Sequence, residues 1–596
     1  MTMQRPRYFL NVESSACGQA WLDALDIRGI NNARVISQKF GFPDALARVL
    51  SARNVDESEA VAFINPTLRD LMPDPKSFTD MQCAAERIVK AILNQEKVAV
   101  FGDYDVDGAC SSALVARFFR YFDMEIKIYI PDRIVEGYGP NEQAMRMLVQ
   151  EGAHLIITVD CGANSPDAIK AARLAGADVI VLDHHQMSEV HQEAVALVNP
   201  NRPDDFSGQG HLCAAGVVFV TLAWVHHLLR KKNFAEKLPD LLSMLDLVAL
   251  ATICDVVPLQ GVNRAFVVKG LQVARSMYNL GIAALTKVAR IGEPLNSFHL
   301  GFLLGPRINA GGRIGDQALG ARLLSCDDKT EADKIAEQLD ELNQERQEME
   351  GIQLAQAEAY IDSLYQNKET PLSLVIAHKE WHPGIVGILA SRLKERFFCP
   401  VFAIALKADG SGVGSGRSIS GIDLGALVRE AVALNLIEKG GGHSMAAGVT
   451  IQSAKIETFR EWLEGKVSLM VSELRTQRSL RIDGCLSASG ANKDLFEMIE
   501  KAGPFGSGNS TPIFVLPSHR LINLCEIGKG HFRLVISNIE GKKLQGIAFR
   551  AVGTPLGSFL SENIGEMIHM AGTLSLNYWN GTINPQLRVI DAAAVV

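Results

Sequence analysis

Acidic and imidazole side chains follow three short apolar runs in this sequence. Asp103, Asp105 and Asp107 come after Val98–Phe101, Asp160 comes after Leu155–Val159, and Asp183-His184-His185 comes after Val179–Leu182. A further acid, Asp255, interrupts the apolar stretch 250–258. Carboxylate oxygens and neutral imidazole nitrogens are ligands of Mn²⁺ and Mg²⁺, so these residues predict a divalent-metal site rather than a zinc–thiolate site.

Charge repulsion indicates that such a site needs cations. If Asp103, Asp105, Asp107, Asp160 and Asp255 converge, each pair of ionised carboxylates repels by about 4 kcal/mol at 4 Å and intermediate dielectric. Two divalent ions supply four positive charges, and we expect two ions in the site. An Asp-x-Asp-x-Asp-Gly pattern also occurs in plain turns and in calcium loops. The calcium loop needs Glu at its twelfth position, where this chain has Leu114, so that alternative fails.

The spacing of the apolar runs predicts the elements that bring these residues together. We expect strands over residues 98–101, 126–130, 155–159 and 179–182, and helices over 109–122, 142–150 and 166–174. Strands that alternate with helices predict an α/β fold with a parallel, doubly wound sheet. In such sheets, ligands bind at the carboxyl ends of the strands, where the strand order reverses. The acidic strand ends are therefore expected to meet in one crevice.

The rest of the chain divides into further predicted parts. We expect an N-terminal extension over residues 1–80, a catalytic α/β domain over 81–328, a long charged connector helix over 329–366, a second α/β domain that binds substrate over 367–470, and a small β-barrel over 475–596. Within the barrel, Asn580-Gly581 predicts a tight hairpin turn.

Composition excludes several classes of protein. The chain has 596 residues, of which 47% are hydrophobic and 21% charged, so it is neither disordered nor a coiled coil. It has no Cys-x-x-Cys pair and no apolar stretch long enough to span a bilayer, which predicts a cytoplasmic protein with no membrane partner. The net charge of −8 argues against a nucleic-acid partner. However, residues 476–596 carry 11 Lys+Arg against 9 Asp+Glu, so the acidic excess lies before the tail.

The motifs resemble those of a known superfamily. Asp105/Asp107, Asp160, Asp183-His184-His185 and Asp255 match, in order, the four motifs of the DHH phosphoesterases. Four further stretches are similar to the RecJ family of single-stranded-DNA-specific exonucleases: Gly305–Arg313, Trp381–Gly387, Gly414–Ser418 and Gly440–His443. The resemblance covers roughly residues 30–596. It implies a DHH-type sheet, a DHH-associated second α/β domain and a C-terminal OB-fold barrel.

The resemblance also implies roles for the metal-site residues. Asp105, Asp107, Asp160, His184 and Asp255 match the metal ligands of the family. Asp160 then bridges the ions and His185 lies beside the scissile phosphate, so Asp107, Asp160 and His185 are the expected catalytic residues. Many members of the superfamily have His where this chain has Phe101, so we expect Asp103 to act as a ligand in its place.

Glycine-rich stretches of the second α/β domain have the groups that a phosphodiester needs. Gly440–Gly448 is expected to form a turn that leads into a helix, which presents backbone N–H groups to an anion. Arg417 suits bidentate phosphate contact. The expected substrate-binding residues are Arg307, Arg313, Ser415, Arg417, Ser418, Gly441, Gly442 and His443. Taken alone, each cluster is equally compatible with a structural turn or with surface arginines.

The tail interleaves basic and aromatic residues. Lys529, Arg533, Lys542, Lys543 and Arg550 lie among Phe532 and Phe549. Basic groups that contact phosphates and rings that stack on bases are typical of an OB-fold that binds single strands, although at least one ring is expected to be barrel core. Gly503–Asn509, just before the barrel, is either a family motif or a linker.

These features predict a metal-dependent phosphodiesterase that uses two Mn²⁺ or Mg²⁺ ions. The resemblance implies that it is an exonuclease that acts in DNA repair and recombination. The resemblance implies 5′→3′ removal of mononucleotides from single-stranded DNA. One alternative is a DHH phosphodiesterase for oligoribonucleotides or other small phosphates, which the barrel counts against. Another is a binding-only scaffold, which the complete set of aspartates and histidines counts against. A helicase and a single-strand-binding protein are expected partners.

Overall fold

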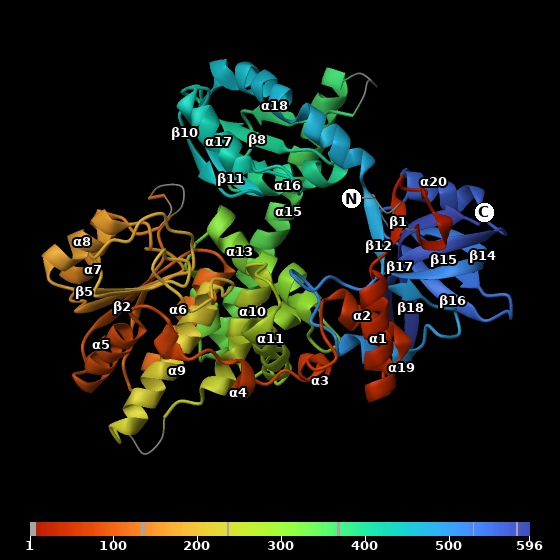
Figure 1. The fold of residues 1–596 in the computed structure, drawn as a ribbon. Coiled ribbons are helices and arrows are strands. Elements are labelled where there is room, and N and C mark those ends of the chain that lie inside the picture. The colour runs from red at the N-terminus through yellow and green to blue at the C-terminus, as the bar shows by residue number, and fades with distance from the viewer. Residues whose placement is uncertain are drawn as a thin grey trace. The chain divides into compact units, whose positions relative to one another are not determined.

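The computed structural model describes residues 8–132, 136–137, 139–234, 238–365, 370–528, 530–579 and 582–595. It divides into two compact units. The first unit is Met1–Asp340 together with Ser479–Val596, and the second unit is Glu341–Arg478. Figure 1 labels many of the helices and strands of both.

A five-stranded parallel sheet carries the acidic strand ends. Its strands are β2 (Val98–Gly102), β3 (Lys127–Tyr129), β4 (Leu155–Val159), β5 (Asp178–Leu182) and β6 (Ala196–Val198). They run in the order β3-β2-β4-β5-β6, and every residue of β2 and β4 is buried. Strands covered on both faces are expected for a doubly wound sheet, so the predicted fold class is confirmed. The strand order reverses between β2 and β4, which places the switch point there.

Helices cover both faces of this sheet. They are α5 (Met81–Leu93), α6 (Val106–Arg120), α7 (Glu142–Gln150), α8 (Pro166–Ala175) and α9 (Ala214–Lys231). α7 and α8 cover one face, and α5, α6 and α9 lie on the other (Figure 1). α9 is apolar, and most of its residues are buried. None of the helices in the described ranges is both long and apolar enough to cross a membrane.

A helical layer follows the sheet along the chain. It consists of α10 (Leu245–Cys254), α11 (Gly261–Ala274), α12 (Leu280–Val288), a π-helical turn (His299–Leu304), α13 (Gly305–Ile314) and α14 (Leu319–Ser325). Every residue of α10 up to Thr252 is buried. This layer therefore completes the core on the side of α6 and α9 and carries Asp255 at its edge.

The C-terminal segment forms a closed barrel. Its elements are β12 (Ser479–Ile482), β13 (Gly484–Cys485), α19 (Lys493–Glu500), β14 (Phe514–Ile527), β15 (His531–Ser537), β16 (Lys543–Ala548), α20 (Pro555–Glu562), β17 (Met567–Trp579) and β18 (Thr582–Ala594). The strands β14-β15-β16-β18-β17 are neighbours in that order, and a further β14–β17 pairing closes the ring. The predicted turn residues Asn580 and Gly581 lie outside the described residues, but Trp579 and Thr582 on either side are paired.

The N-terminal extension packs against this barrel. Its elements are β1 (Ala20–Asp23), α1 (Ile27–Phe40), α2 (Asp44–Ala52), α3 (Ala60–Ile64) and α4 (Leu68–Leu71). β1 pairs in parallel with β12. The fully buried Trp21 donates from Nε1 to Asp591 of β18 at 2.9 Å. The red N-terminal helices consequently lie beside the blue barrel in Figure 1.

The second unit is a smaller α/β body. Its elements are β7 (Leu374–His378), α16 (Val386–Phe397), β8 (Val401–Leu406), β9 (Ser411–Arg417), α17 (Leu424–Ala433), β10 (Lys439–Gly442), β11 (Ala446–Gln452) and α18 (Ile456–Thr476). The sheet order is β10-β11-β9-β8-β7, in which only the β7–β8 pair is parallel. The charged connector is, as predicted, one helix, α15 (Lys329–Tyr365).

One local prediction in this unit is wrong. Gly440–Gly448 does not form a turn leading into a helix; it forms the hairpin of β10 and β11. The reason is the alternation that follows, because Ala447, Val449 and Ile451 are buried while the residues between them are not. A period of two selects a strand over a helix. An anion site at the start of a helix therefore cannot be built on Gly440–Gly448.

Candidate metal centre and nucleic-acid interface

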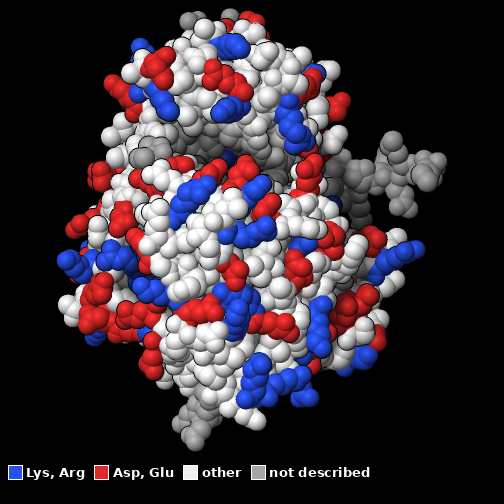
Figure 2. All heavy atoms as spheres, turned by 90° about the vertical axis from the view of Figure 1, so that its left-hand side faces the viewer, with Lys and Arg blue, Asp and Glu red and all other residues white. Residues whose placement is uncertain are grey.

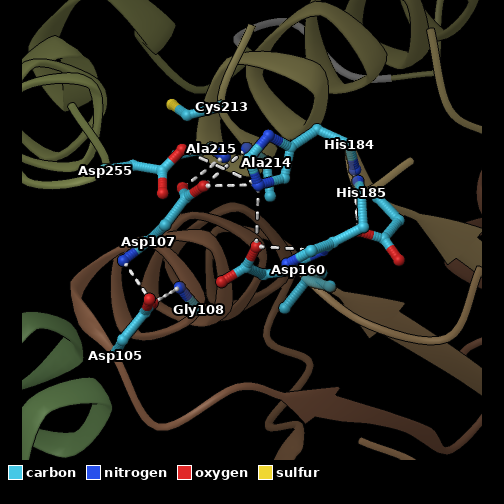
Figure 3. Close-up of polar contacts among 12 residues, drawn as sticks. Asp105, Asp107, Gly108, Asp160, His184, His185, Cys213, Ala214, Ala215 and Asp255 are labelled. Carbon is cyan, nitrogen blue, oxygen red and sulfur yellow. Dashed lines mark hydrogen bonds and ion pairs between the residues drawn. The ribbon is translucent and has the colours of Figure 1, made fainter. Parts of the chain in front are cut away.

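The acidic strand ends meet at the switch point of the parallel sheet. Residues 103–107 follow β2, Asp160 follows β4 and residues 183–185 follow β5, and these three strands are neighbours. Asp255 comes from elsewhere, at the C-terminal end of α10. Figure 3 shows the carboxylates of Asp107, Asp160 and Asp255 turned toward the imidazole of His184. The structure thus brings the predicted ligands together.

The distances between these ligand atoms suit shared cations. Nε2 of His184 lies 3.3 Å from Oδ1 of Asp160, 3.7 Å from Oδ2 of Asp255 and 3.8 Å from Oδ2 of Asp107. Ligands that each lie ~2.1 Å from one ion are ~3 to 4 Å apart. Three groups have all their ligand atoms within 4.8 Å of one another: Asp107/His184/Asp255, Asp160/His184/His185 and Asp103/Asp105/Asp160. Asp160 and His184 each belong to two groups, which suits two neighbouring ions.

The start of α6 holds Asp105 and Asp107. Asp105 is the N-cap, and its Oδ1 accepts hydrogen bonds from the backbone N–H groups of Asp107 (2.9 Å) and Gly108 (3.1 Å). A Cβ on Gly108 would lie 2.4 Å from the carbonyl oxygen of Asp103, so only glycine fits there. The Asp-Gly sequence is therefore needed for this tight capping turn.

A second helix, α9, holds the Asp107 carboxylate through two hydrogen bonds. Its two oxygens accept from the backbone N–H groups of Ala214 (2.6 Å) and Ala215 (2.8 Å), in the first turn of α9. The positive end of this helix favours the ionised carboxylate and fixes its direction. The small residues Cys213-Ala214-Ala215-Gly216 at the start of this apolar helix allow the close approach, but nothing in the sequence indicates that Asp107 is the partner.

Burial makes ionisation of the cluster costly unless cations neutralise it. Burial, and then the charges of the neighbouring aspartates, raise the pKa of Asp160 well above its ordinary value. The same causes raise the pKa of Asp255 to about 9, and burial raises that of Asp107. No described Lys or Arg forms an ion pair with Asp107 or Asp255. Buried carboxylates with oxygen-rich surroundings and one or two imidazoles fit hard divalent ions such as Mn²⁺ and Mg²⁺.

His185 is oriented by Asp183, a residue that the sequence interpretation left without a role. Nδ1 of His185 lies 2.8 Å from Oδ1 of Asp183, whose other oxygen accepts from the N–H of Ala163 at 3.0 Å. Burial alone would lower the pKa of His185, but the hydrogen bond and charge of Asp183 raise it to about 9. Burial opposes the shift at Asp183 too, yet His185 lowers its pKa to about 2. This pair favours a positively charged imidazole.

Two asparagines hold the backbone of the same loop. Nδ2 of Asn199 donates to the carbonyl of His185 at 2.8 Å, and Nδ2 of Asn201 donates to that of His184 at 2.6 Å. Both residues follow β6, the neighbour of β5. Sequence reasoning missed them, because nothing in Asn199-Pro200-Asn201 indicates which loop it faces.

Phe101 occupies core rather than the metal site. Its side chain is fully buried, and its ring centroid lies 5.4 Å from that of Tyr129. Asp103, two residues further on, belongs to the group with Asp105 and Asp160. That group offers oxygen atoms alone, so an ion bound there would have no imidazole ligand from this group.

In the second unit, two motifs meet at the start of α16. Arg417 donates from NH1 to Oγ of Ser415 at 2.9 Å. A Cβ placed on Gly387, in the first turn of α16, would lie 3.1 Å from NH2 of Arg417 and 3.2 Å from Ser415 Oγ. The Trp381–Gly387 stretch therefore brings a helix N-terminus beside an arginine and a hydroxyl, which is a chemically reasonable anion site.

The other predicted residues of this unit are placed differently. Ser418 is buried and donates to the carbonyl of Ile422 at 2.8 Å, so its hydroxyl serves the local turn. Gly441, Gly442 and His443 are exposed on and beside the edge strand β10. The backbone groups of the exposed glycines are accessible to a ligand, whereas the Ser418 hydroxyl is buried in the turn and is not.

Arg307 and Arg313 both lie on α13. The Arg307 guanidinium forms hydrogen bonds within the protein: Nε donates to Asp340 at 2.8 Å and NH1 to the carbonyl of Leu303 at 2.7 Å. Arg313 is half-buried. Its neighbour Gly312 touches the metal-site loop, because a Cβ there would lie 2.6 Å from the ring of Tyr104. Arg313 is therefore the better placed of the two for substrate contact.

The outer face of the barrel combines arginines with exposed rings. Arg533, Ile547 and Arg588 form one cross-strand row on β15, β16 and β18, and both arginines are exposed. The Arg588 guanidinium lies 5.1 Å from the ring centroid of Phe549, which is 50% exposed. It also lies 5.7 Å from the ring of Phe298 in the helical layer. This surface has the cations and π-faces that single strands need.

The remaining tail residues divide between core and surface. Phe532 packs against the barrel core, as expected for one of the two predicted rings. Lys542, Lys543 and Arg550 are exposed, and Lys529 lies outside the described residues. On the face drawn in Figure 2, by contrast, acidic and basic side chains are interspersed over the first unit.

Comparison with known proteins agrees with this architecture. Residues 97–252 match the DHH family N-terminal domain, residues 370–469 match the DHHA1 domain and residues 482–591 match the RecJ OB domain. The chain is 34% identical to the single-stranded-DNA-specific exonuclease RecJ of Salmonella typhimurium, over 92% of this chain and 96% of that protein. It belongs to the RecJ family.

Other relatives extend this result. RecJ of Bacillus subtilis is 33% identical over 94% of this chain and 70% of its own length. The structure of Thermus thermophilus RecJ in complex with Mn²⁺ superposes with a TM-score of 0.75, at 26% identity, covering 94% of this chain and 78% of that one. The Mg²⁺ complex of the same protein gives a TM-score of 0.71. RecJ relatives thus bind the ions that the carboxylate cluster fits.

Proposed function

We propose that this chain is a divalent-metal-dependent exonuclease that degrades single-stranded DNA from the 5′ end to mononucleotides in DNA repair and recombination. The observation that carries the proposal is the convergence of Asp103, Asp105, Asp107, Asp160, His184 and Asp255 in a RecJ-family chain. The barrel supports a polymeric substrate over the small-phosphate alternative, because its outer face offers rings and arginines along several nucleotides.

The metal centre is proposed to act as follows. Asp103, Asp105, Asp107, Asp160, His184 and Asp255 would hold two Mn²⁺ or Mg²⁺ ions, and Asp160 belongs to two of the ligand groups. When bound, such ions polarise a phosphodiester, activate water as the nucleophile and stabilise the leaving oxygen. His185, kept positively charged by Asp183, suits a hydrogen bond to a phosphoryl oxygen. Asp107 and Asp160 therefore position the chemistry, and His185 contacts the reacting phosphate.

Substrate positioning is assigned to separate groups. Arg417 and Ser415, with the N-terminus of α16, suit a terminal phosphate. The exposed backbone of Gly441 and Gly442 and the side chain of His443 offer further donors. Arg313 and the Arg533–Arg588 row suit the backbone of the strand further along. Arg307 and Ser418 are proposed to stabilise the local fold rather than to contact substrate, because their side chains already form hydrogen bonds within the protein.

Partners and compartment are part of the same proposal. An exonuclease that degrades single strands needs another activity to separate the duplex first, which supports a helicase as a partner. Single-strand-binding protein binds the same substrate, which supports it as a second partner. All ten cysteines are free thiols, which suits the reducing cytoplasm.

End-labelled substrates test the proposal. Matched single- and double-stranded DNA and RNA, labelled at either end, are incubated with Mn²⁺, Mg²⁺ or EDTA. We expect early loss of the 5′ label from single-stranded DNA, with either ion and not in EDTA. Early loss of the 3′ label would contradict the polarity, and equal digestion of duplexes would contradict the substrate.

A further inference from the structure

The aspartates of the metal centre are not all held in the same way. The carboxylate of Asp107 accepts two backbone hydrogen bonds, and that of Asp105 accepts two more. Among the described residues, the Asp255 carboxylate accepts no hydrogen bond, and its one ion-pair contact is with His184 at 3.7 Å. The direction of the Asp255 side chain is therefore set by its own backbone.

That backbone adopts an unfavourable conformation. α10 ends at Asp255, whose N–H donates to the carbonyl of Ala251 at 2.9 Å. The next residue, Val256, has φ +59° and is 66% exposed. A β-branched residue is strained in the left-handed region, and little packing holds its exposed side chain. Something beyond Val256 must keep the chain in this conformation.

The restraint comes from the loop Gly503–Asn509, just before the barrel. The N–H of Leu259 donates to the carbonyl of Ser507 at 2.8 Å, and Leu259 is buried. A Cβ on Gly508 would lie 3.1 Å from Cβ of Pro258, so the two backbones are in close contact. The segment that follows Asp255 is thus clamped against a loop almost 250 residues further along the chain.

The loop is itself rigid enough to act as a clamp. Nδ2 of the buried Asn509 donates to the carbonyls of Ala502 and Pro504, both at 2.9 Å. At its base, Arg264 of α11 donates to the carbonyls of Ala502 at 2.9 Å and Lys501 at 3.0 Å. The loop is therefore fixed in two ways: Asn509 holds its internal shape, and Arg264 attaches its base to the helical layer.

We infer that the Gly503–Asn509 loop is a positioning element for the metal ligand Asp255. The loop holds the strained turn at Val256 in place, and the turn aims the carboxylate at His184. Divalent-ion affinity at the Asp107/His184/Asp255 group then depends on a segment that contributes no ligand. This inference rests on the proposed function in one respect, namely that an ion binds at Asp255.

Gly508→Ala tests the inference in the full chain. Gly508 has φ +70°, and the added Cβ pushes on Pro258. Gly565→Ala is the matched control, since Gly565 also has positive φ (+92°) but no atom within 4 Å of the new Cβ. Mn²⁺ affinity is measured without DNA by electron paramagnetic resonance titration, together with the thermal midpoint. We expect Gly508→Ala to bind about tenfold more weakly than Gly565→Ala, or ~1.4 kcal/mol.

A double-mutant cycle separates positioning from general damage. In an Asp255→Asn background, Gly508→Ala should weaken Mn²⁺ binding no further, because the ligand it misplaces is already lost. Asn509→Ala removes the hydrogen bonds that shape the loop and should reproduce the tenfold loss of Mn²⁺ affinity. If Gly508→Ala does not fold, Asn509→Ala replaces it in the comparison with Gly565→Ala.

The outcomes distinguish two failures. Equal affinities of the Gly508→Ala and Gly565→Ala chains, or additive losses with Asp255→Asn, overturn the positioning role alone. A parent chain that binds no Mn²⁺ overturns the proposed function and this inference with it.

Discussion

The metal centre of the first unit and the anion site of the second unit are built in opposite ways. In the metal centre, Asp107 and Asp160 are 1% and 2% exposed, and backbone N–H groups fix the Asp107 carboxylate. In the second unit, Arg417 is half-buried and His443 is exposed on an edge hairpin. Buried, fixed charges stabilise a transition state strongly, whereas exposed charges mainly add affinity. Substitutions in the first site should therefore lower kcat, and those in the second should raise KM.

The largest expected effect is at Asp160, the ligand that we propose the two ions share. Asp160→Asn removes the charge that two ligand groups share, and we expect kcat to fall by at least ~10³-fold with little change in KM. Initial rates on single-stranded DNA with Mn²⁺ check this. Asp167→Asn, an exposed aspartate in the first turn of α8, is the control and should leave the rate unchanged. A loss confined to KM would contradict the assignment of Asp160 to the metal centre.

Substitution in the proposed anion site should have a smaller effect, and that effect should be on KM rather than on kcat. Arg417→Ala removes a charged hydrogen-bond donor, so we expect kcat/KM to fall by ~10- to 100-fold, mainly through KM. The loss should be larger for strands with a 5′ phosphate than for strands with a 5′ hydroxyl. Arg429→Ala, on the exposed face of α17, is the matched control. Equal losses on the two kinds of strand would remove Arg417 from the terminal-phosphate site.

Titration of the buried acids should appear as pH-dependent metal binding. The pKa of Asp255 is raised to about 9, so the metal-free folded chain keeps a proton that the unfolded chain loses above about pH 4. Stability without metal therefore falls as pH rises from about 4 toward 9, and metal affinity rises by up to ~tenfold per pH unit for each proton released.

This expectation is checked by thermal unfolding in Mn²⁺ and in EDTA between pH 6 and 9. The difference between the two midpoints should widen as pH rises. Asp255→Asn should flatten that trend, because the residue that exchanges its proton for the ion is gone. A difference that stays constant with pH would show that the carboxylates are already ionised without metal.

The barrel face should show the smallest effect. Phe549→Ala removes one exposed ring beside Arg588, and we expect Kd for a long thymidine strand to rise by ~fivefold or more in EDTA. Phe206→Ala, at a ring 92% exposed on the catalytic domain, is the matched control. Anisotropy against salt concentration adds a second readout, because Arg588→Ala should lower the salt slope by ~0.7. An unchanged slope would remove Arg588 from the strand path.

Sequence reasoning located the sheet and its ligands because both depend on local pattern. Continuous apolar runs predict β2, β4 and β5, and the acids that end them follow at once. It failed where the partner is distant in sequence. The N–H groups of Ala214 and Ala215 that hold Asp107 lie more than 100 residues away, and no local signal names their target.

Weak local propensity accounts for other failures. α1 contains Gly29 and two adjacent asparagines, so its pattern does not predict a helix. Packing of Ala33 and Ile36, and capping by Asp26, stabilise it instead. The β10–β11 hairpin was missed because glycines suit a helix-leading turn as well as an edge strand, and only burial on the sheet decides between them.

The pairing of β1 with β12 has a consequence for how this chain is made. Ala20 faces Ser479 across the ladder, and Trp21 bonds to Asp591, which is 570 positions away. At ~5 to 20 residues per second, β1 is synthesised roughly half a minute to a minute and a half before its partner strand exists. Throughout that interval Trp21 has no barrel to cover it. β1 is therefore synthesised long before the strand with which it pairs, and its pairing is one of the late steps of folding.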